Sequence, residues 1–418
     1  MRTDRFGWVI VFLLFAGSTV NYMDRALFAF VMPQIRRSLS LTNTDYSLAV
    51  NAFLLLYMVF YVVGGRVADR VGYRRAFLFN VIVWSIASML HSLTRGITSL
   101  CLFRALLGVG EGGFFPTAMQ AITQFFAPSN RVKAVALVIT GGSVGMLITP
   151  LIGAWVTLHF GWRAAFFVTG SIGFLLVPPW LFLHRKSDRS PAGRLFVRPD
   201  KSQDVVESKF EEDMSLGKAI FRRQYLFLLT ARSITDAVWF FYLFWVPGYF
   251  QDIRHFNLAN IGTLLWIPFL SADIGCLAGA WASSSLIKQG FGLDPSHKTV
   301  MLISALLCLF GPFACYVTLP SVALGLLSIA FFGQFSWGSN LHTVITEITP
   351  PRHVAALFGI TGAVGTLMAV ISQPLIGHLV DSVGYGPAFA AAGLIFTVAI
   401  VLLLAAGKIK CFESTCCS

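Results

Sequence analysis

A short charged loop between two apolar stretches decides the fold of this chain: GRVADRVGYRR, residues 65–75. The flanking apolar stretches, near 46–66 and 76–94, are each long enough to cross a hydrocarbon core of roughly 30 Å. Gly65 and Gly72 permit close helix approach and a sharp turn. Asp69 can accept hydrogen bonds from a helix N-terminus or an arginine and so latch one conformer. The loop therefore predicts two membrane-spanning helices joined by a tight, charged turn.

The composition of the whole chain agrees with a lipid-embedded protein. Of its 418 residues, 56% are hydrophobic and only 12% are charged, whereas charged residues make up roughly a quarter of a soluble protein. The apolar residues fall into runs of about 20, the length of a membrane-spanning helix. We therefore expect an all-α membrane protein with twelve transmembrane helices, near residues 7–34, 46–66, 76–94, 97–121, 131–157, 163–183, 224–250, 260–287, 298–317, 320–346, 353–378 and 386–407.

The longest polar interval, residues 184–223, divides these helices into two sets of six. Such a division is typical of two repeated six-helix bundles. We expect an N-terminal bundle at 1–183, a cytoplasmic linker at 184–223, a C-terminal bundle at 224–407 and a cytoplasmic tail at 408–418.

The distribution of basic residues predicts the orientation of the chain. Of the 31 Lys and Arg residues, three lie within predicted spans and all but five of the others lie on the side of the termini and linker. The five on the opposite side are Arg36, Arg37, Arg95, Arg163 and Arg254. Because cytoplasmic loops carry the excess of Lys and Arg, both termini are expected in the cytoplasm of a multi-pass inner (plasma) membrane protein. The net charge of +12 does not indicate a nucleic-acid partner, because the Lys and Arg residues lie in short loops between apolar spans. The lipid bilayer is the expected surrounding of the chain, and we expect a monomer.

The sequence offers no enzyme or metal signature. Its seven cysteines show neither CxxC nor Cys/His metal spacing, and the role of the C-terminal cysteine cluster is left open. No nucleophile–base pair is evident. The glycine-rich stretch 108–113 lies inside a predicted span and follows no strand, so it is not a nucleotide loop. We expect a protein that is not an enzyme and binds no metal or organic cofactor.

Four charged residues lie deep inside predicted spans: Asp24, Arg25, Arg104 and Glu111. Each costs about 2.5–3.5 kcal/mol at mid-bilayer on insertion scales, so such residues are functional candidates. On one helix, Arg104 and Glu111 are seven residues apart, which places them on one stripe and roughly 10 Å apart along the axis. Asp24 points to another side of its helix than Arg25. These groups must face a wet cavity, a ligand or each other, the alternative being ion pairs that only hold helices together.

The chemistry of these side chains suggests their roles. Arg25 and Arg104 would bind the anionic end of a substrate, because a guanidinium cannot be neutralised and forks onto a carboxylate. A desolvated carboxylate can carry a proton near neutral pH, which makes Asp24 and Glu111 proton-coupling candidates. Tyr22, which shares a helix face with Arg25, and Tyr57 would hydrogen-bond substrate hydroxyls.

Polar residues in the second bundle are less clearly assigned. Trp337 and Asn340 share one helix face and would suit a carbohydrate-like ligand through stacking and amide hydrogen bonds, although Asn340 could equally join two helices. Arg232 and Asp236 are spaced to neutralise one another. Asp273 could line a cavity or cap a broken helix, and the roles of these three charges stay open.

Several motifs resemble known families. The 65–75 loop resembles the G-x-L-A-D-R-x-G-R-[KR]-[KR] loop of the major facilitator superfamily. The stretches NYMDR (21–25) and RALLGVGEGGFFP (104–116) resemble the anion:cation symporter family within it. The stretches 235–247, 267–275 and 337–341 are most similar to hexuronate transporters. Departures occur at 141–143 and 359–363, where the family often has polar residues and this chain has mainly glycine and other small residues.

The resemblance implies proton symport, with Arg104, Tyr22 and Tyr57 contacting substrate and Arg25 paired with Glu111. It further implies that Asp24 and Glu111 couple protons. Asp69 and Arg70 are expected to act in gating. We therefore expect a proton-coupled symporter that imports a sugar-acid anion, such as galacturonate or glucuronate, by alternating access, with the proton as coupling ion. The alternatives are another organic anion (aldonate, aldarate, aromatic carboxylate or organophosphate) or a non-transporting membrane sensor.

Overall fold

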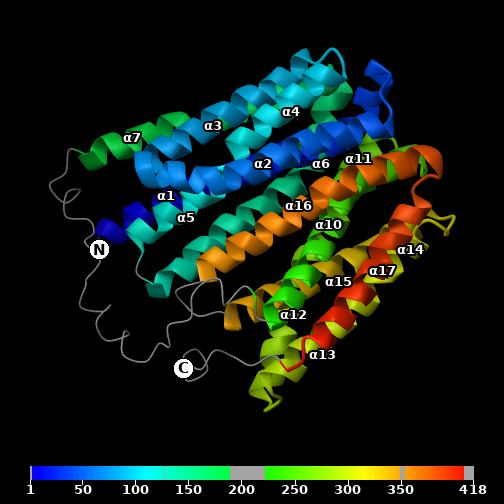
Figure 1. The fold of residues 1–418 in the computed structure, drawn as a ribbon. Coiled ribbons are helices and arrows are strands. Elements are labelled where there is room, and N and C mark those ends of the chain that lie inside the picture. Colours follow the sequence, from blue (N-terminus) through cyan, green and yellow to red (C-terminus); the bar gives the residue numbers. More distant parts are fainter. Residues whose placement is uncertain (1, 127, 189–220, 222, 349–353, 409–418) are drawn as a thin grey trace.

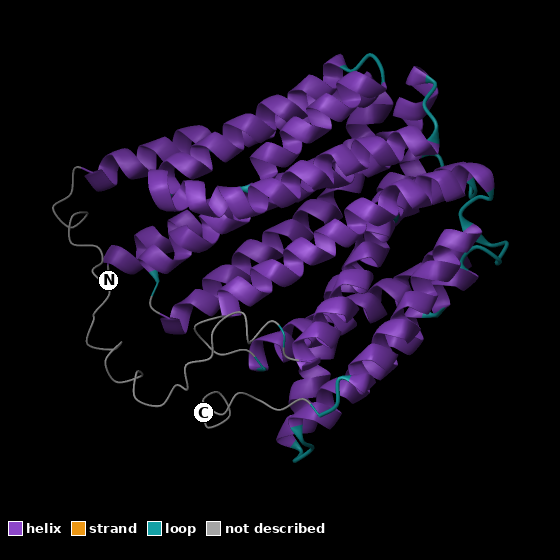
Figure 2. Ribbon diagram, in the orientation of Figure 1, coloured by secondary structure: helices purple, strands orange, loops and turns teal. Residues whose placement is uncertain are grey.

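A computed structural model describes residues 2–126, 128–188, 221, 223–348 and 354–408, and within these ranges the regular structure is helical (Figures 1 and 2). The first part of the chain forms α1 (Arg2–Leu39), α2 (Asn43–Val71), α3 (Tyr73–Leu90), η1 (His91–Leu93), α4 (Ile97–Gly112), α5 (Phe114–Phe125), α6 (Pro128–Phe174) and α7 (Val177–Asp188). The second part forms α10 (Arg223–Asp252), α11 (Leu258–Leu264), α12 (Trp266–Lys288), α13 (Leu293–Cys308), α14 (Phe310–Phe313), α15 (Pro320–Glu347), α16 (Val354–Ser382) and α17 (Gly386–Ala405).

Within the described residues, eleven helical segments are long and apolar enough to cross a membrane. One of them, Lys133–His184, has 52 residues, about twice the length that one crossing needs. Gly161 interrupts it with φ 83° and ψ 164°, a backbone conformation that glycine adopts without a Cβ penalty. This segment therefore holds two crossings, and the expected fold of twelve helices in two bundles is confirmed (Figure 1). The linker expected at 184–223 lies largely outside the described residues.

Several expected spans are broken by short interruptions. The fourth span consists of α4 and α5, which meet at Gly113, and the eighth consists of α11 and α12, which meet at Leu265. A Cβ added at Gly113 would lie 2.6 Å from the side-chain oxygen of Asn80 on α3. The break at Gly113 therefore lies where the chain packs closely against α3. Hydropathy alone does not reveal such a break.

Glycines on α4 bring it against α2 and so position the first bundle's buried charges. A Cβ at Gly108 would lie 2.5 Å from the carbonyl oxygen of Phe53, and one at Gly112 would lie 2.6 Å from that of Tyr57. Only glycine permits this backbone approach. It sets the stripe that carries Arg104 and Glu111 directly beside the aromatic residues of α2.

The 65–75 loop forms the expected sharp turn, but its close helix contact differs from the prediction. Gly72 has φ 82°, the conformation that ends α2 and starts α3. A Cβ at Gly65 would make only an ordinary contact, 3.6 Å from Pro116, whereas one at Gly64 would lie 2.5 Å from the Cα of Gly113. The expectation for Gly65 was therefore wrong by one residue, because helix rotation turns Gly64 toward α5.

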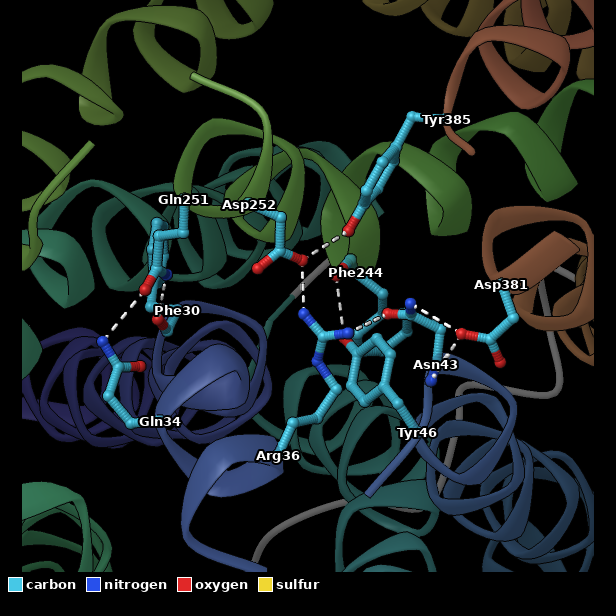
Figure 3. A network of polar contacts seen from close by, with 10 residues as sticks. All are labelled: Phe30, Gln34, Arg36, Asn43, Tyr46, Phe244, Gln251, Asp252, Asp381 and Tyr385. Carbon is cyan, nitrogen blue, oxygen red and sulfur yellow. Dashed lines mark hydrogen bonds and ion pairs between the residues drawn. The ribbon is translucent and has the colours of Figure 1, made fainter. Parts of the chain in front are cut away.

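The two bundles meet through polar contacts at one end of the molecule, which we call the distal end; it is the end where α1 finishes at Leu39 and α10 at Asp252. Arg36 forms an ion pair with Asp252 and a hydrogen bond to Asn43 (Figure 3). Asp381 on α16 accepts hydrogen bonds from the backbone N–H groups of Asn43 (3.1 Å) and Thr44 (2.7 Å) and from both their side chains. An acidic side chain thus caps the N-terminus of α2 from the opposite bundle.

Further hydrogen bonds extend this contact, which we call the distal seal. The hydroxyl of Tyr46 donates to the Phe244 carbonyl at 2.7 Å, and the amide of Gln34 donates to Gln251 at 2.9 Å (Figure 3). Tyr385 also donates to Asp252, at 3.2 Å. The described conformation is therefore closed at the distal end, opposite to the end where α7 finishes and α10 begins.

Replacing Asp252 with Asn is expected to favour opening of the distal end by roughly fivefold, because a half-buried ion pair of this kind contributes about 1 kcal/mol. Spin labels at Leu93 and Leu319 would report it, since both side chains are exposed and lie at the distal ends of different bundles. Their distance distribution should gain a longer component. Asp294→Asn, which breaks an ion pair to Lys298 within α13, is the matched control. An unchanged distribution in Asp252→Asn would contradict a sealing role.

Candidate substrate and coupling site

A buried ion pair joins α1 to α4 at the centre of the first bundle. The Nε of Arg25 donates to the Oε2 of Glu111 at 2.5 Å, and the two side chains are 4% and 0% exposed. The Nη2 of Arg25 also donates to Asn21 one turn earlier, at 2.8 Å. This is the pairing that the family resemblance implies. The Oε1 of Glu111 has no hydrogen-bond partner among the described residues.

Two tyrosines enclose the guanidinium of Arg25. Its Cζ lies 4.9 Å from the ring centroid of Tyr22 and 4.4 Å from that of Tyr57, within the range of a cation–π interaction. A Cβ at Gly142 on α6 would lie 2.8 Å from the ring of Tyr22. The glycines at 141 and 142, where the family often has polar residues, thus allow α6 to pack directly on α1 and its tyrosine.

Arg104 is the other arginine of this bundle's interior, and its surroundings are different. Its side chain is fully buried, and its Cζ lies 4.1 Å from the ring of Phe28, 4.5 Å from Phe53 and 6.0 Å from Phe244 of the opposite bundle. None of its three side-chain nitrogens has a hydrogen-bond partner among the described residues. An aromatic cage stabilises the charge but leaves five N–H donors unpaired, which is costly in a buried position.

Asp24 faces a different wall, as its position on the helix predicts. Its Oδ1 accepts a hydrogen bond from Ser88 on α3 at 2.8 Å, and Ser88 lies 3.4 Å from Thr169 on α6. The Oδ2 of Asp24 is buried and has no hydrogen-bond partner among the described residues. The two buried carboxylates of the bundle therefore differ, since Glu111 is paired with an arginine and Asp24 only with a hydroxyl.

The two residues expected to act in gating lie at the end of α2, away from this cluster. Asp69 is exposed and accepts a hydrogen bond from Gln120 on α5 at 3.1 Å, while Arg70 is exposed. Asp69 thus joins two helices of the same bundle in the described conformation. Its expected role in gating stays a prediction.

Trp337 and Asn340 lie inside the second bundle. The ring of Trp337 packs edge-on against Phe396 of α17, with 5.8 Å between centroids. The side chain of Asn340 contacts the Nδ1 of buried His297 on α13 at 2.9 Å and donates to the carbonyl of Ser336. Asn340 therefore makes the interhelical contact that was one of its two expected roles, and the structure does not bring either residue to the arginines of the first bundle.

The three charged residues of the second bundle whose roles were left open lie in two places. The Nε of Arg232 lies 3.3 Å from Asp236, and its Nη1 donates to Thr361 on α16 at 2.5 Å. Asp273 on α12 instead reaches the opposite bundle, where it accepts a hydrogen bond from Ser143 at 2.7 Å. The first two charges neutralise one another as their spacing suggested.

Sequence reasoning missed several residues of this site. Asn21 stands in the quoted NYMDR motif at i−4 from Arg25, so helical spacing was a usable signal. Phe28, Phe53 and Phe244 surround Arg104 from three helices, and no sequence spacing links them. The described residues contain no group of three or more His, Cys, Asp or Glu side chains that could hold a metal ion.

Known proteins are similar to this chain in sequence or in structure. The chain is 25% identical to a hexuronate transporter of Escherichia coli (strain K12) over 390 residues, covering 92% of this chain and 90% of that protein. It is 26% identical to a D-galactonate transporter of Escherichia coli O6:H1 over 427 residues, covering 98% and 97%. The crystal structure of a D-xylose–proton symporter superposes with a TM-score of 0.74 at 17% identity, covering 95% and 97%.

The family model named Major Facilitator Superfamily matches residues 14–372. This match covers most of the chain, including the loop at 65–75, the Arg25–Glu111 pair and the cage around Arg104. The chain is therefore a multi-pass membrane transporter that belongs to the Major Facilitator Superfamily.

Proposed function

We propose that this protein is a proton-coupled symporter that imports a sugar-acid anion, such as galacturonate or glucuronate, across the inner membrane. The observation that carries the proposal is the buried guanidinium of Arg104, whose N–H groups have no hydrogen-bond partner among the described residues. A carboxylate would satisfy two of these donors at once and neutralise the charge. The similarity to hexuronate and D-galactonate transporters supports a sugar acid as that carboxylate.

The cage around Arg104 supports alternating access. Phe28 and Phe53 belong to the first bundle, whereas Phe244 belongs to α10 of the second and accepts the seal's hydrogen bond from Tyr46 through its carbonyl oxygen. Opening of the distal seal would move Phe244 away from Arg104. Substrate binding and exposure to the distal side are then coupled through one aromatic residue.

Glu111 supplies the proton coupling in this proposal. While ionised, it holds Arg25 at 2.5 Å. Protonation removes the charge that Arg25 neutralises, so the guanidinium becomes available to the anion between Tyr22 and Tyr57. Asp24, which accepts a hydrogen bond from Ser88 and forms no ion pair with any described residue, offers a second proton site. The proton is the coupling ion, and the mechanism requires no cofactor.

The orientation proposed for this transporter follows its charge. Both termini and the linker would face the cytoplasm because that side carries most of the Lys and Arg residues. The distal seal would then close the outer side, and Asp69 and Arg70 would belong to the gate on the inner side. The proposal requires only a monomer, because one chain holds both bundles.

Uptake into proteoliposomes tests the function directly. Labelled galacturonate or glucuronate should accumulate when the outside is more acidic than the inside, and only equilibrate without a pH gradient. For one proton per monovalent anion, each pH unit drives about tenfold accumulation. If neither hexuronate is transported or competes, but another carboxylate or an organophosphate is transported, the proposed substrate is wrong. Arg104 would then keep its anion-binding role for that other substrate.

A further inference from the structure

Asp273 is a carboxylate that the proposed transport cycle does not use. It lies on α12, is partly exposed, and accepts a hydrogen bond from Ser143 on α6 at 2.7 Å. This bond crosses between the two bundles, like the distal seal, but it lies well inside the spans. Ser143 follows fifteen residues after the start of α6, whereas the charged residues of the seal, Arg36, Asp252 and Asp381, lie near helix ends. Asp273 makes no ion pair with any described residue.

The neighbours of Ser143 connect Asp273 to the proposed site. Gly142 immediately precedes Ser143, and its Cα faces the ring of Tyr22 so closely that a Cβ would lie 2.8 Å from it. Tyr22 in turn lies against the guanidinium of Arg25. One short segment of α6 therefore touches the tyrosine of the anion site on one side and Asp273 of the opposite bundle on the other.

The balance of charges within the spans limits what the site can accept. Of the three arginines inside the spans, Arg25 is paired with Glu111 and Arg232 with Asp236. Arg104 alone is left with three unpartnered nitrogens among the described residues. In the described conformation, with Arg25 held by Glu111, the site thus offers one unpaired cation, Arg104, to a carboxylate. On the opposite bundle, Asp273 is a carboxylate without an ion-pair partner among the described residues.

From this juxtaposition we infer that Asp273 determines specificity: it recognises the hydroxyl-bearing end of a substrate whose carboxylate is bound by Arg104, and it excludes substrates with a second carboxylate. A carboxylate accepts hydrogen bonds from sugar hydroxyls, as it now does from the hydroxyl of Ser143. A second substrate carboxylate would instead meet a like charge, which is a repulsive element of the kind that produces specificity. The inference rests on the proposed transport of sugar acids.

Competition between two sugar acids tests the inference. Galacturonate carries one carboxylate and galactarate carries one at each end. In the wild-type protein, at least tenfold more galactarate than unlabelled galacturonate should be needed to halve the uptake of labelled galacturonate. In Asp273→Asn this gap should shrink to threefold or less, chiefly because galactarate competes better. Asp273→Glu, which keeps the charge, should retain the wild-type preference.

Ser143→Ala separates recognition from a merely structural link, because it removes the hydrogen bond but leaves the carboxylate. It should keep the tenfold preference. An equal loss of preference in Ser143→Ala and Asp273→Asn would overturn the inference. A wild-type protein that accepts galactarate and galacturonate equally well would also overturn it. In both cases the proposed transport of sugar acids would still stand. A wild-type protein that transports no sugar acid would overturn the proposed function and this inference together.

Discussion

Arg104→Ala is expected to lose binding of the substrate anion by at least a hundredfold. Arg104 is fully buried, and its guanidinium nitrogens have no hydrogen-bond partner among the described residues. A carboxylate bound there forms charge-assisted hydrogen bonds in a site shielded from water. Removing one partner of such a buried pair costs about 3 kcal/mol, which corresponds to roughly a hundredfold in affinity. Binding of galacturonate to the purified protein, measured by calorimetry, gives the result directly.

Two further variants make the measurement specific. Arg104→Lys keeps the positive charge but loses the planar fork, so an intermediate loss is expected. Arg163→Ala removes an arginine that lies over Trp162 and donates to the Thr94 carbonyl, outside the cage, and it should bind like the wild type. Unchanged affinity in Arg104→Ala would remove the anion-binding role from this residue and the main support from the proposed function.

The sequence predicts the membrane-spanning architecture well, because hydropathy reports directly on the lipid environment. It also separates two spans, 131–157 and 163–183, where the structure has one long helical segment with a turn at Gly161. It fails at the rotation of a helix about its axis. The contact of Gly64 with Gly113 was missed by one residue, because the exact rotation of α2 depends on its packing partner.

The candidate site was predictable where its residues share a helix. Arg104 and Glu111 lie on one stripe of α4 by their spacing alone, and Asp24 diverges from Arg25 for the same reason. Contacts between helices were not predictable in this way. The pairing of Arg25 with Glu111 came from resemblance, and the Arg36–Asp252 ion pair joins residues 216 positions apart. For Asn340, helical spacing predicted only that it shares a helix face with Trp337. It could not reveal that His297 of α13 already contacts the Asn340 side chain.

Glu111→Gln is expected to abolish accumulation driven by a proton gradient while it preserves exchange of substrate across the membrane. Glutamine has nearly the shape of glutamic acid, but it neither carries a titratable proton nor neutralises Arg25, to which Glu111 is bound at 2.5 Å. With an acidic exterior two pH units below the interior, a one-proton symporter should accumulate a monovalent anion about a hundredfold. The variant should reach a ratio near one, because its Arg25 is permanently free to bind the anion without a proton.

Exchange distinguishes a lost coupling step from a damaged protein. Proteoliposomes preloaded with unlabelled substrate should still take up labelled substrate through Glu111→Gln, because exchange needs alternating access but no net proton movement. Glu347→Gln is the matched control, since Glu347 lies on α15 at 3.5 Å from His297, outside the proposed site, and should accumulate normally. If Glu111→Gln accumulates substrate like the wild type, the coupling proton must be carried elsewhere, and Asp24 becomes the carboxylate to test, because it is buried in the same bundle and bonded only to a hydroxyl.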